Sequence, residues 1–142
     1  MQVGAKTDQL HGTPVLVTGT VRTLSDGFFT ETKVRHGGWG HNDQGITAVI
    51  ETENRHTVVV TSQRMAPLSL EQLLSLGIKP ETKQVLIVKG VIAPQAAYQP
   101  IASEIILVDT PGSTSANPSN FIYRKRRKPL YPLEEDAVYS TL

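Results

Sequence analysis

Short runs of aliphatic and β-branched residues, separated by glycine, proline and polar residues, carry most of the apolar content of this 142-residue chain. Runs of this length and composition are typical of strands, and they are far too short to span a membrane. The runs that we expect to form strands are residues 15–21, 28–30, 46–51, 57–61, 84–90 and 105–108. The sequence therefore predicts a fold built on a sheet.

Turn residues between these runs indicate how the strands connect. Residues 52–56 form a polar connection of hairpin length, so strands 46–51 and 57–61 should pair antiparallel. Ser25-Asp26-Gly27 has turn chemistry, because Asp accepts a hydrogen bond from its own local backbone and Gly accepts a positive φ. We therefore expect a second hairpin at this turn, leading into residues 28–30.

Glycines mark two further places in the first third of the chain. Gly19 lies within the first apolar run, where glycine is typical of a bulge or of a close approach by another backbone. Residues 36–45 contain several glycines and are expected to form an irregular loop.

The sequence predicts a short helix with recognisable ends. Ser69 and Gln72 have the spacing of a capping box, which places the first turn directly after Ser69. Gly77 is suited to the left-handed residue that ends a helix, and Ile78 can then pack back on Leu73 in a Schellman motif.

The second half of the chain predicts strand, helix and strand in succession. The continuous apolar run 84–90 is typical of a strand buried on both faces, and residues 96–102 should form a short helix with Pro100 in a first turn. Together with strand 105–108 this succession indicates a parallel crossover. We therefore expect an α+β fold with a mixed, largely antiparallel sheet, two short helices and an extended C-terminal arm.

Changes in composition along the chain suggest three parts. Residues 1–12 are expected to be a linker from a missing N-terminal domain, residues 13–120 the α+β domain, and residues 121–142 an extended arm containing basic residues and proline. In the arm, we expect the basic run 124–128 to face acidic surface or solvent. The residues expected to pack on this domain or on its missing partner are Phe121, Tyr123, Leu130 and Tyr131.

Composition excludes several kinds of functional site. The chain has no cysteine, so it has no disulfide, no thiolate nucleophile and no cysteine zinc site. His36 and His41 flank the glycine-rich loop, but a loop of this kind fixes no ligand geometry, and the chain has no H-E-x-x-H helix. We expect no metal site, no resident cofactor and no catalytic residue in this chain.

The charge distribution and the first residues bear on partners and location. The formal net charge is +1, and an acidic stretch follows the basic run almost at once, so we do not expect nucleic-acid binding. The first residues lack the features of a secretory signal. We expect a soluble, cytoplasmic protein that does not bind membranes.

Three residues are candidates for contact with a substrate or with another domain. Lys89 lies at the carboxyl end of the expected buried strand, where open α/β sheets bind ligands, although a lysine there can also extend to solvent. Arg64 follows strand 57–61 and is either a bidentate carboxylate ligand or a surface arginine. Asp26, in the Ser-Asp-Gly turn, is the third candidate.

Several strings, in order along the chain, resemble the C-terminal domain of the MlrC-like (microcystin LR degradation protein type) metallopeptidase family. They are similar to the family's V-R-x-L-S-D-G, V-V-V-T-S-x-R, S-L-G-I-x-P, V-K-[SG], A-[FY]-x-P-I-A and V-D-T-P-G patterns. The matching stretches are residues 21–30, 58–64, 76–80, 88–90, 97–102 and 108–112, followed by 123–124 and 129–133. The chain departs from the family at residues 93–95, where Ala-Pro-Gln replaces an H-F-R string of many relatives.

The resemblance implies a larger hydrolase of which this chain is one part. An N-terminal domain of the same protein would supply Asp and His ligands for a divalent metal, with zinc expected, and would hydrolyse a peptide or amide substrate. This chain would be inactive alone, would support the metal-bearing domain and would form one wall of the substrate cleft. The alternative is a stand-alone binding module that holds an anionic ligand or a partner protein near Lys89 or on the basic arm.

Overall fold

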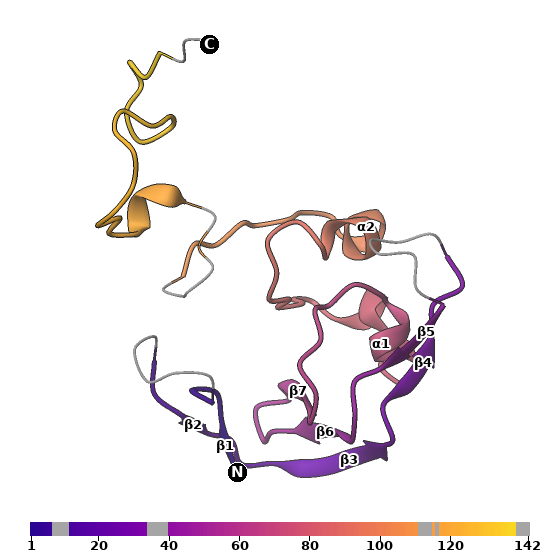
Figure 1. Cartoon of the computed structure of the whole chain (residues 1–142). Helices are drawn as coiled ribbons and strands as arrows, with labels where there is room; N and C mark the ends of the chain where they lie inside the picture. The colour runs from indigo at the N-terminus through magenta and orange to yellow at the C-terminus, as the bar shows by residue number, and fades with distance from the viewer. Residues whose placement is uncertain (7–11, 34–39, 111–114, 116, 139–142) are drawn as a thin grey trace.

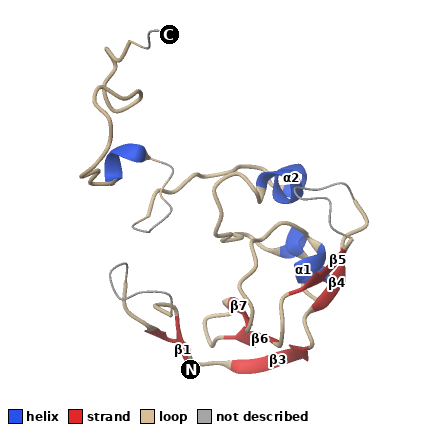
Figure 2. Ribbon diagram, in the orientation of Figure 1, coloured by secondary structure: helices blue, strands red, loops and turns tan. Residues whose placement is uncertain are grey.

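The computed structural model describes residues 1–6, 12–33, 40–110, 115 and 117–138 of the chain. Strands dominate its first half, and short helices and loops make up the second half (Figures 1 and 2). The strands are β1 (Gln2–Val3), β2 (Val15–Leu16), β3 (Thr20–Ser25), β4 (Phe28–Thr30), β5 (His41–Asp43), β6 (Thr47–Glu51) and β7 (Thr57–Thr61). The helices are α1 (Glu71–Leu74) and α2 (Gln95–Tyr98), with 3-10 turns η1 (Pro80–Thr82), η2 (Gln99–Ile101) and η3 (Pro118–Asn120).

The main sheet has three antiparallel strands in the order β3-β6-β7. Strands β6 and β7 form the expected hairpin, with Thr47 opposite Thr61 and Glu51 opposite Thr57. Strand β3 pairs with the other edge of β6, so that Ser25 lies opposite Thr47. All strand pairs among the described residues are antiparallel.

The first apolar run is split between two sheets. Residues 15 and 16 form β2, which pairs with β1, and the chain enters the main sheet only at Thr20. Gly19 lies at this transition, where a Cβ atom would come within 3.0 Å of the Glu51 carbonyl oxygen. The expected close approach at Gly19 is therefore confirmed, and β1 shows that part of the expected linker contributes a short strand.

The Ser25-Asp26-Gly27 turn forms as expected, but the hairpin predicted there is wrong. Asp26 Oδ1 accepts a hydrogen bond from the Phe28 backbone at 3.1 Å, and Gly27 has a φ of +83°. The turn directs β4 away from β3 to pair with β5. Residues 41–43, expected to be part of an irregular loop, are therefore a strand.

Helix α1 begins with the predicted capping interaction. The buried Gln72 side chain accepts hydrogen bonds from the backbone N–H groups of Leu68 and Ser69, at 2.8 and 3.2 Å, and donates one to the Ala66 carbonyl at 3.2 Å. Ser69 Oγ accepts from the Glu71 N–H at 3.0 Å. The capping box is thus formed, with the serine oxygen bonded one residue earlier than in the usual arrangement.

The end of α1 is the predicted Schellman motif. Gly77 has a φ of +78°. The Ile78 N–H donates to the Leu73 carbonyl at 3.0 Å, and the Gly77 N–H donates to the Leu74 carbonyl at 3.0 Å. Leu73 packs against the core cluster that contains Ile78, as this motif requires.

Two small apolar clusters form the core on the side of the sheet that faces the helices. The first joins Val49 of β6 to Leu76 and Ile78, and the second joins Leu70 to Ala97 and Tyr98 of α2. Leu73 of α1 packs against both clusters, which agrees with the place of α1 between the sheet and α2 in Figure 1. The predicted second short helix is confirmed by α2 and η2, with Pro100 in the first turn of η2.

Two predicted strands are absent from the structure. Residues 84–90 and 105–108 form neither strand nor helix, so the predicted parallel crossover does not form (Figure 2). Leu86 and Val88 are half-buried against the second core cluster, whereas Val85 and Ile87 are 76% and 95% exposed. A continuous apolar run forms a central strand only where neighbouring strands and a second layer exist, and here α1 and α2 cover one face alone.

The C-terminal arm runs away from the sheets in Figure 1. Within it, the rings of Phe121 and Tyr123 contact each other edge-on at a centroid distance of 6.2 Å, and Ile122 is 91% exposed. Tyr131 is also exposed, so packing of the arm residues on a partner stays a prediction.

In the described part of the chain no helix has the length and apolarity required to cross a bilayer. With its largely antiparallel sheets and two short helices, the chain has the predicted α+β fold class.

The capping interaction of Gln72 predicts a loss of stability on its removal. The change Gln72→Ala should lower the free energy of unfolding by about 1–3 kcal/mol, because it leaves buried backbone N–H groups without an acceptor. Gln95→Ala in α2 is the matched control, since the Gln95 side chain makes no hydrogen bond among the described residues. Equal unfolding midpoints in urea for the two variants would contradict the prediction.

Candidate functional site

One end of the main sheet gathers turns from three parts of the chain. Ser25 of β3 and Thr61 of β7 both lie opposite Thr47 of β6. The turns that continue from these strand ends therefore meet here, and they contain two of the three sequence-predicted contact residues, Asp26 and Arg64. We call this region, residues 25–27, 43–45 and 62–64, the turn junction.

Backbone contacts hold the turn junction together. The Gln44 N–H donates to the Gly27 carbonyl at 3.2 Å, and the Gln63 N–H donates to the Gln44 carbonyl at 3.1 Å. A Cβ atom on Gly27 would come within 3.0 Å of the Gly45 carbonyl oxygen. Gly45 itself has a φ of +67°, and a Cβ there would overlap the Ser62 side chain. Both glycines are therefore required by close packing as well as by their positive φ.

The polar side chains of the turn junction are mostly committed to the fold. Asp43 accepts from the Gly45 N–H at 2.7 Å and from Gln63 Nε2 at 3.3 Å. The Gln44 side chain is 2% exposed, and its Nε2 has no hydrogen-bond partner among the described residues. Arg64 is exposed and makes no hydrogen bond or ion pair within the described residues, so its guanidinium is available for an external carboxylate.

Sequence reasoning missed the middle segment of the turn junction. The glycine content of residues 43–45 predicts an irregular loop, yet Asp43 accepts a hydrogen bond from the N–H two residues on, as Asp26 does. A signal existed in the sequence, because an Asp that accepts from a nearby backbone N–H, followed by a glycine, indicates an ordered turn.

Lys89 is in a different structural setting from the one predicted. It is exposed in the extended segment after Val88, and it does not follow a paired strand. Gly90 lies close to Pro94, where a Cβ atom would be 2.8 Å from the proline ring. Among the described residues no hydrogen bond or ion pair joins Lys89 to Asp26 or Arg64, so its role in contact stays a prediction.

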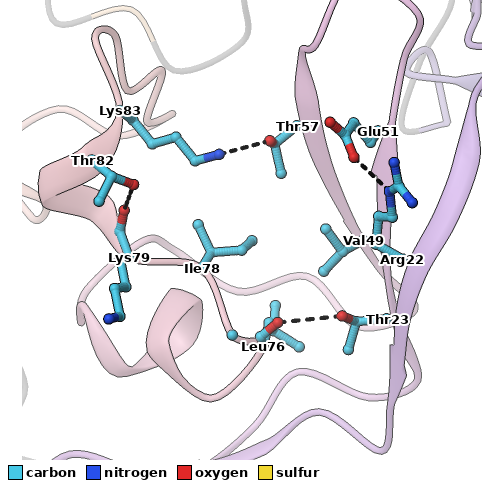
Figure 3. A pocket seen from close by; sticks show the side chains of 11 residues that line it. Arg22, Thr23, Val49, Glu51, Thr57, Leu76, Ile78, Lys79, Thr82 and Lys83 are labelled. Carbon is cyan, nitrogen blue, oxygen red and sulfur yellow. Dashed lines mark hydrogen bonds and ion pairs between the residues drawn. The ribbon is translucent and has the colours of Figure 1, made fainter.

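An open groove of about 350 Å³ lies between the main sheet and the turn after α1 (Figure 3). Buried core residues form its floor, and its rim carries three cationic side chains and one carboxylate, which leaves a net charge of +2. Arg22 Nε pairs with Glu51 at 2.5 Å, and Lys83 Nζ donates to Thr57 Oγ1 at 3.0 Å. The cationic residues are Arg22, Lys79 and Lys83, and the floor residues are Val49, Leu76 and Ile78.

Donor groups for a metal do not converge in the described residues. No group of three or more His, Asp or Glu side chains there could hold an ion. His41 Nδ1 lies 3.3 Å from Thr30 Oγ1, in the pairing of β4 with β5. His36, the other histidine considered from the sequence, lies outside the described residues.

The basic run of the arm contains one well-defined ion pair. Arg126 binds both carboxylate oxygens of Glu134, and Glu134 Oε2 also accepts from the Leu130 N–H at 2.8 Å. The hydrogen bond from Arg126 and that from the Leu130 backbone lower the pKa of the Glu134 carboxyl, and the bond to Glu134 raises the pKa of Arg126. Arg126 of the basic run thus faces an acidic group, Glu134, of the arm itself. The prediction for the run was contact with acidic surface or solvent.

Residues 1–125 match the model of the family described as MlrC C-terminus. The chain therefore belongs to this family, which confirms the family resemblance found in the sequence. No curated protein and no solved structure matches the chain.

The close contact at the turn junction predicts a steric cost at Gly27. Gly27→Ala should lower the free energy of unfolding by about 1–2 kcal/mol from the left-handed backbone and by a further 1–3 kcal/mol or so from overlap with the Gly45 carbonyl. Gly77→Ala is the matched control, because its φ of +78° is similar and its Cβ would meet nothing within 4 Å. Equal loss of stability in the two variants, measured by thermal unfolding, would contradict the steric contact.

The ion pair in the arm predicts a pH-dependent local structure. Because the folded pKa of Glu134 is lowered, the stabilisation is fully present above its ordinary value of 4.5 and is lost as the pH falls through the lower folded value. The Leu130 amide chemical shift should therefore titrate with a midpoint below 4.5. Arg126→Gln should raise this midpoint, whereas Arg127→Gln should leave it unchanged, and a midpoint insensitive to Arg126→Gln would contradict the assignment.

Proposed function

We propose that this chain is the non-catalytic C-terminal domain of a metal-dependent peptidase or amide hydrolase. In this proposal it supports a metal-bearing N-terminal domain of the same protein and forms one wall of the substrate cleft. The observation that carries the proposal is the family match over residues 1–125, because the family is described as a C-terminal region. The protein is proposed to act in the cytoplasm.

The distribution of ionisable groups supports this division of labour. A catalytic zinc site needs three protein ligands and an open position, and no such ligand group lies in the described residues. The metal, with zinc expected, and the activated water would therefore belong to the N-terminal domain. This domain would contribute contacts to a substrate already positioned at the metal.

Arg64 is proposed as the main polar contact of this domain. Its exposed guanidinium extends from the turn junction, whose backbone is held by the Gly27 and Gly45 contacts. A planar guanidinium is suited to bidentate binding of a carboxylate on the substrate or on the N-terminal domain. Asp26 lies at the same end of the sheet and would contact a donor group there.

The groove in Figure 3 favours a second function, in which the chain alone binds an anionic ligand, because cationic side chains line its rim. Glu51 neutralises one of the three cationic side chains, and Lys79 and Lys83 make no ion pair among the described residues. A small anion would be attracted to the uncompensated positive charge of this rim.

The hydrolase proposal is tested by comparing two polypeptides for zinc content and peptide cleavage. One is encoded by the whole reading frame, and the other is the 142-residue chain. The longer polypeptide should hold about one zinc per chain by elemental analysis and cleave peptides until a chelator removes the metal. The 142-residue chain should do neither. An inactive, metal-free longer polypeptide would contradict the proposal, and binding of inorganic phosphate by the short chain at Lys83 would then favour the second function.

In the same longer polypeptide, Arg64→Gln should raise KM for an acidic peptide about tenfold or more, because a charge-assisted hydrogen bond contributes about 1.5–3 kcal/mol. Arg55→Gln is the control, since Arg55 lies in the β6–β7 turn at the opposite end of the sheet. Equal kinetics for the two variants would remove Arg64 from the proposal.

A further inference from the structure

Two extended segments of the chain have no backbone partner within the part that the structure describes. Residues 84–88 and 105–108 make no backbone hydrogen bond among the described residues. Both are apolar, and most of their side chains are exposed. The most exposed of these are Val85, Ile87, Ile106, Leu107 and Val108, at 76%, 95%, 75%, 76% and 73%.

The first segment nevertheless has the side-chain pattern of a strand. Leu86 and Val88 pack against the second core cluster, whereas Val85 and Ile87 between them point away from it. This alternation with a period of two is that of a strand with one face on a core. The segment is thus held at one face and presents free N–H and C=O groups along its length.

The second segment is linked to the first through η2 and the second core cluster. Residues 105–108 follow η2, whose Ile101 packs against the same core cluster as Leu86 and Val88. The two segments are therefore connected through one cluster and one helix, although they lie far apart in the sequence. An apolar surface with unpaired extended backbone is the usual template for addition of a strand.

We infer that residues 84–88 and 105–108 become strands by pairing with extended backbone of the N-terminal domain, so that sheet structure continues across the domain boundary. This inference rests on the proposed function, because the family description places a preceding region before this domain. The partner must present strand edges with an apolar face to cover Val85, Ile87 and Leu107. Lys89 would then follow a paired strand, the position predicted for it from the sequence.

Hydrogen exchange of backbone amides tests the inference directly. In the 142-residue chain the amides of both segments should exchange at nearly unprotected rates, and in the longer polypeptide at least about 100-fold more slowly, as expected for paired strands. Fast exchange of both segments in the longer polypeptide would overturn the inference. Protection in the 142-residue chain that increases with its concentration would also overturn it, because a second copy would then be the partner.

A pair of variants separates a specific contact from a general effect of charge. Ile87→Asp should abolish most of the protection of residues 84–88 in the longer polypeptide, whereas Ile122→Asp, at a similar exposure in the arm, should not. Both variants of the 142-residue chain should unfold at the temperature of the parent chain, which shows that the domain still folds. Equal protection with either variant would overturn the inference.

The two proposals fail independently. An active zinc enzyme whose segments 84–88 and 105–108 exchange rapidly would contradict only the strand pairing. A longer polypeptide with both segments protected, but without zinc or hydrolysis, would contradict only the hydrolase function.

Discussion

The backbone contact between Gly27 and Gly45 is the constraint on which the arrangement of the sheets depends. It bends the chain out of β3 and sends β4 to pair with β5, and it places the 43–45 turn beside the end of β7. A side chain at Gly27 would overlap the Gly45 backbone, and one at Gly45 would overlap Ser62 and Gln63 at the end of β7. The 43–45 turn also accepts a hydrogen bond from the Gln63 N–H, so packing within the fold determines where Arg64, the proposed contact residue, lies.

The described residues form a small packed core, and they also leave an apolar surface exposed. Strands β6 and β7, α1 and α2 contribute residues to two small apolar clusters, whereas residues 84–88 and 105–108 leave apolar side chains and backbone groups exposed. Exposed apolar patches of this kind usually mark an interface. The proposed N-terminal domain would cover this exposed surface.

Elements with local signals were predictable from the sequence. The capping interaction of Gln72 and the Schellman motif at Gly77 each depend on residues within a few positions of one another, and so does the β6–β7 hairpin. The turn at Asp26 was also predictable, but its consequence was not. Turn chemistry does not specify which strand the chain pairs with next, and here a contact with Gly45 decided it. The groove likewise combines residues from distant strands and turns.

The sequence by itself determined the family, the α+β class and the ends of α1, because repeated short strings and cap residues carry that information locally. It also determined that residues 84–90 are apolar enough to be a strand. Only the tertiary structure decided that β3 pairs with β6, that Asp26 and Arg64 lie at the same end of the sheet, and that residues 84–90 find no strand partner among the described residues. The physical reason is that a strand needs hydrogen-bond partners from another segment. The residues of an apolar run do not indicate whether the rest of the chain provides such a segment.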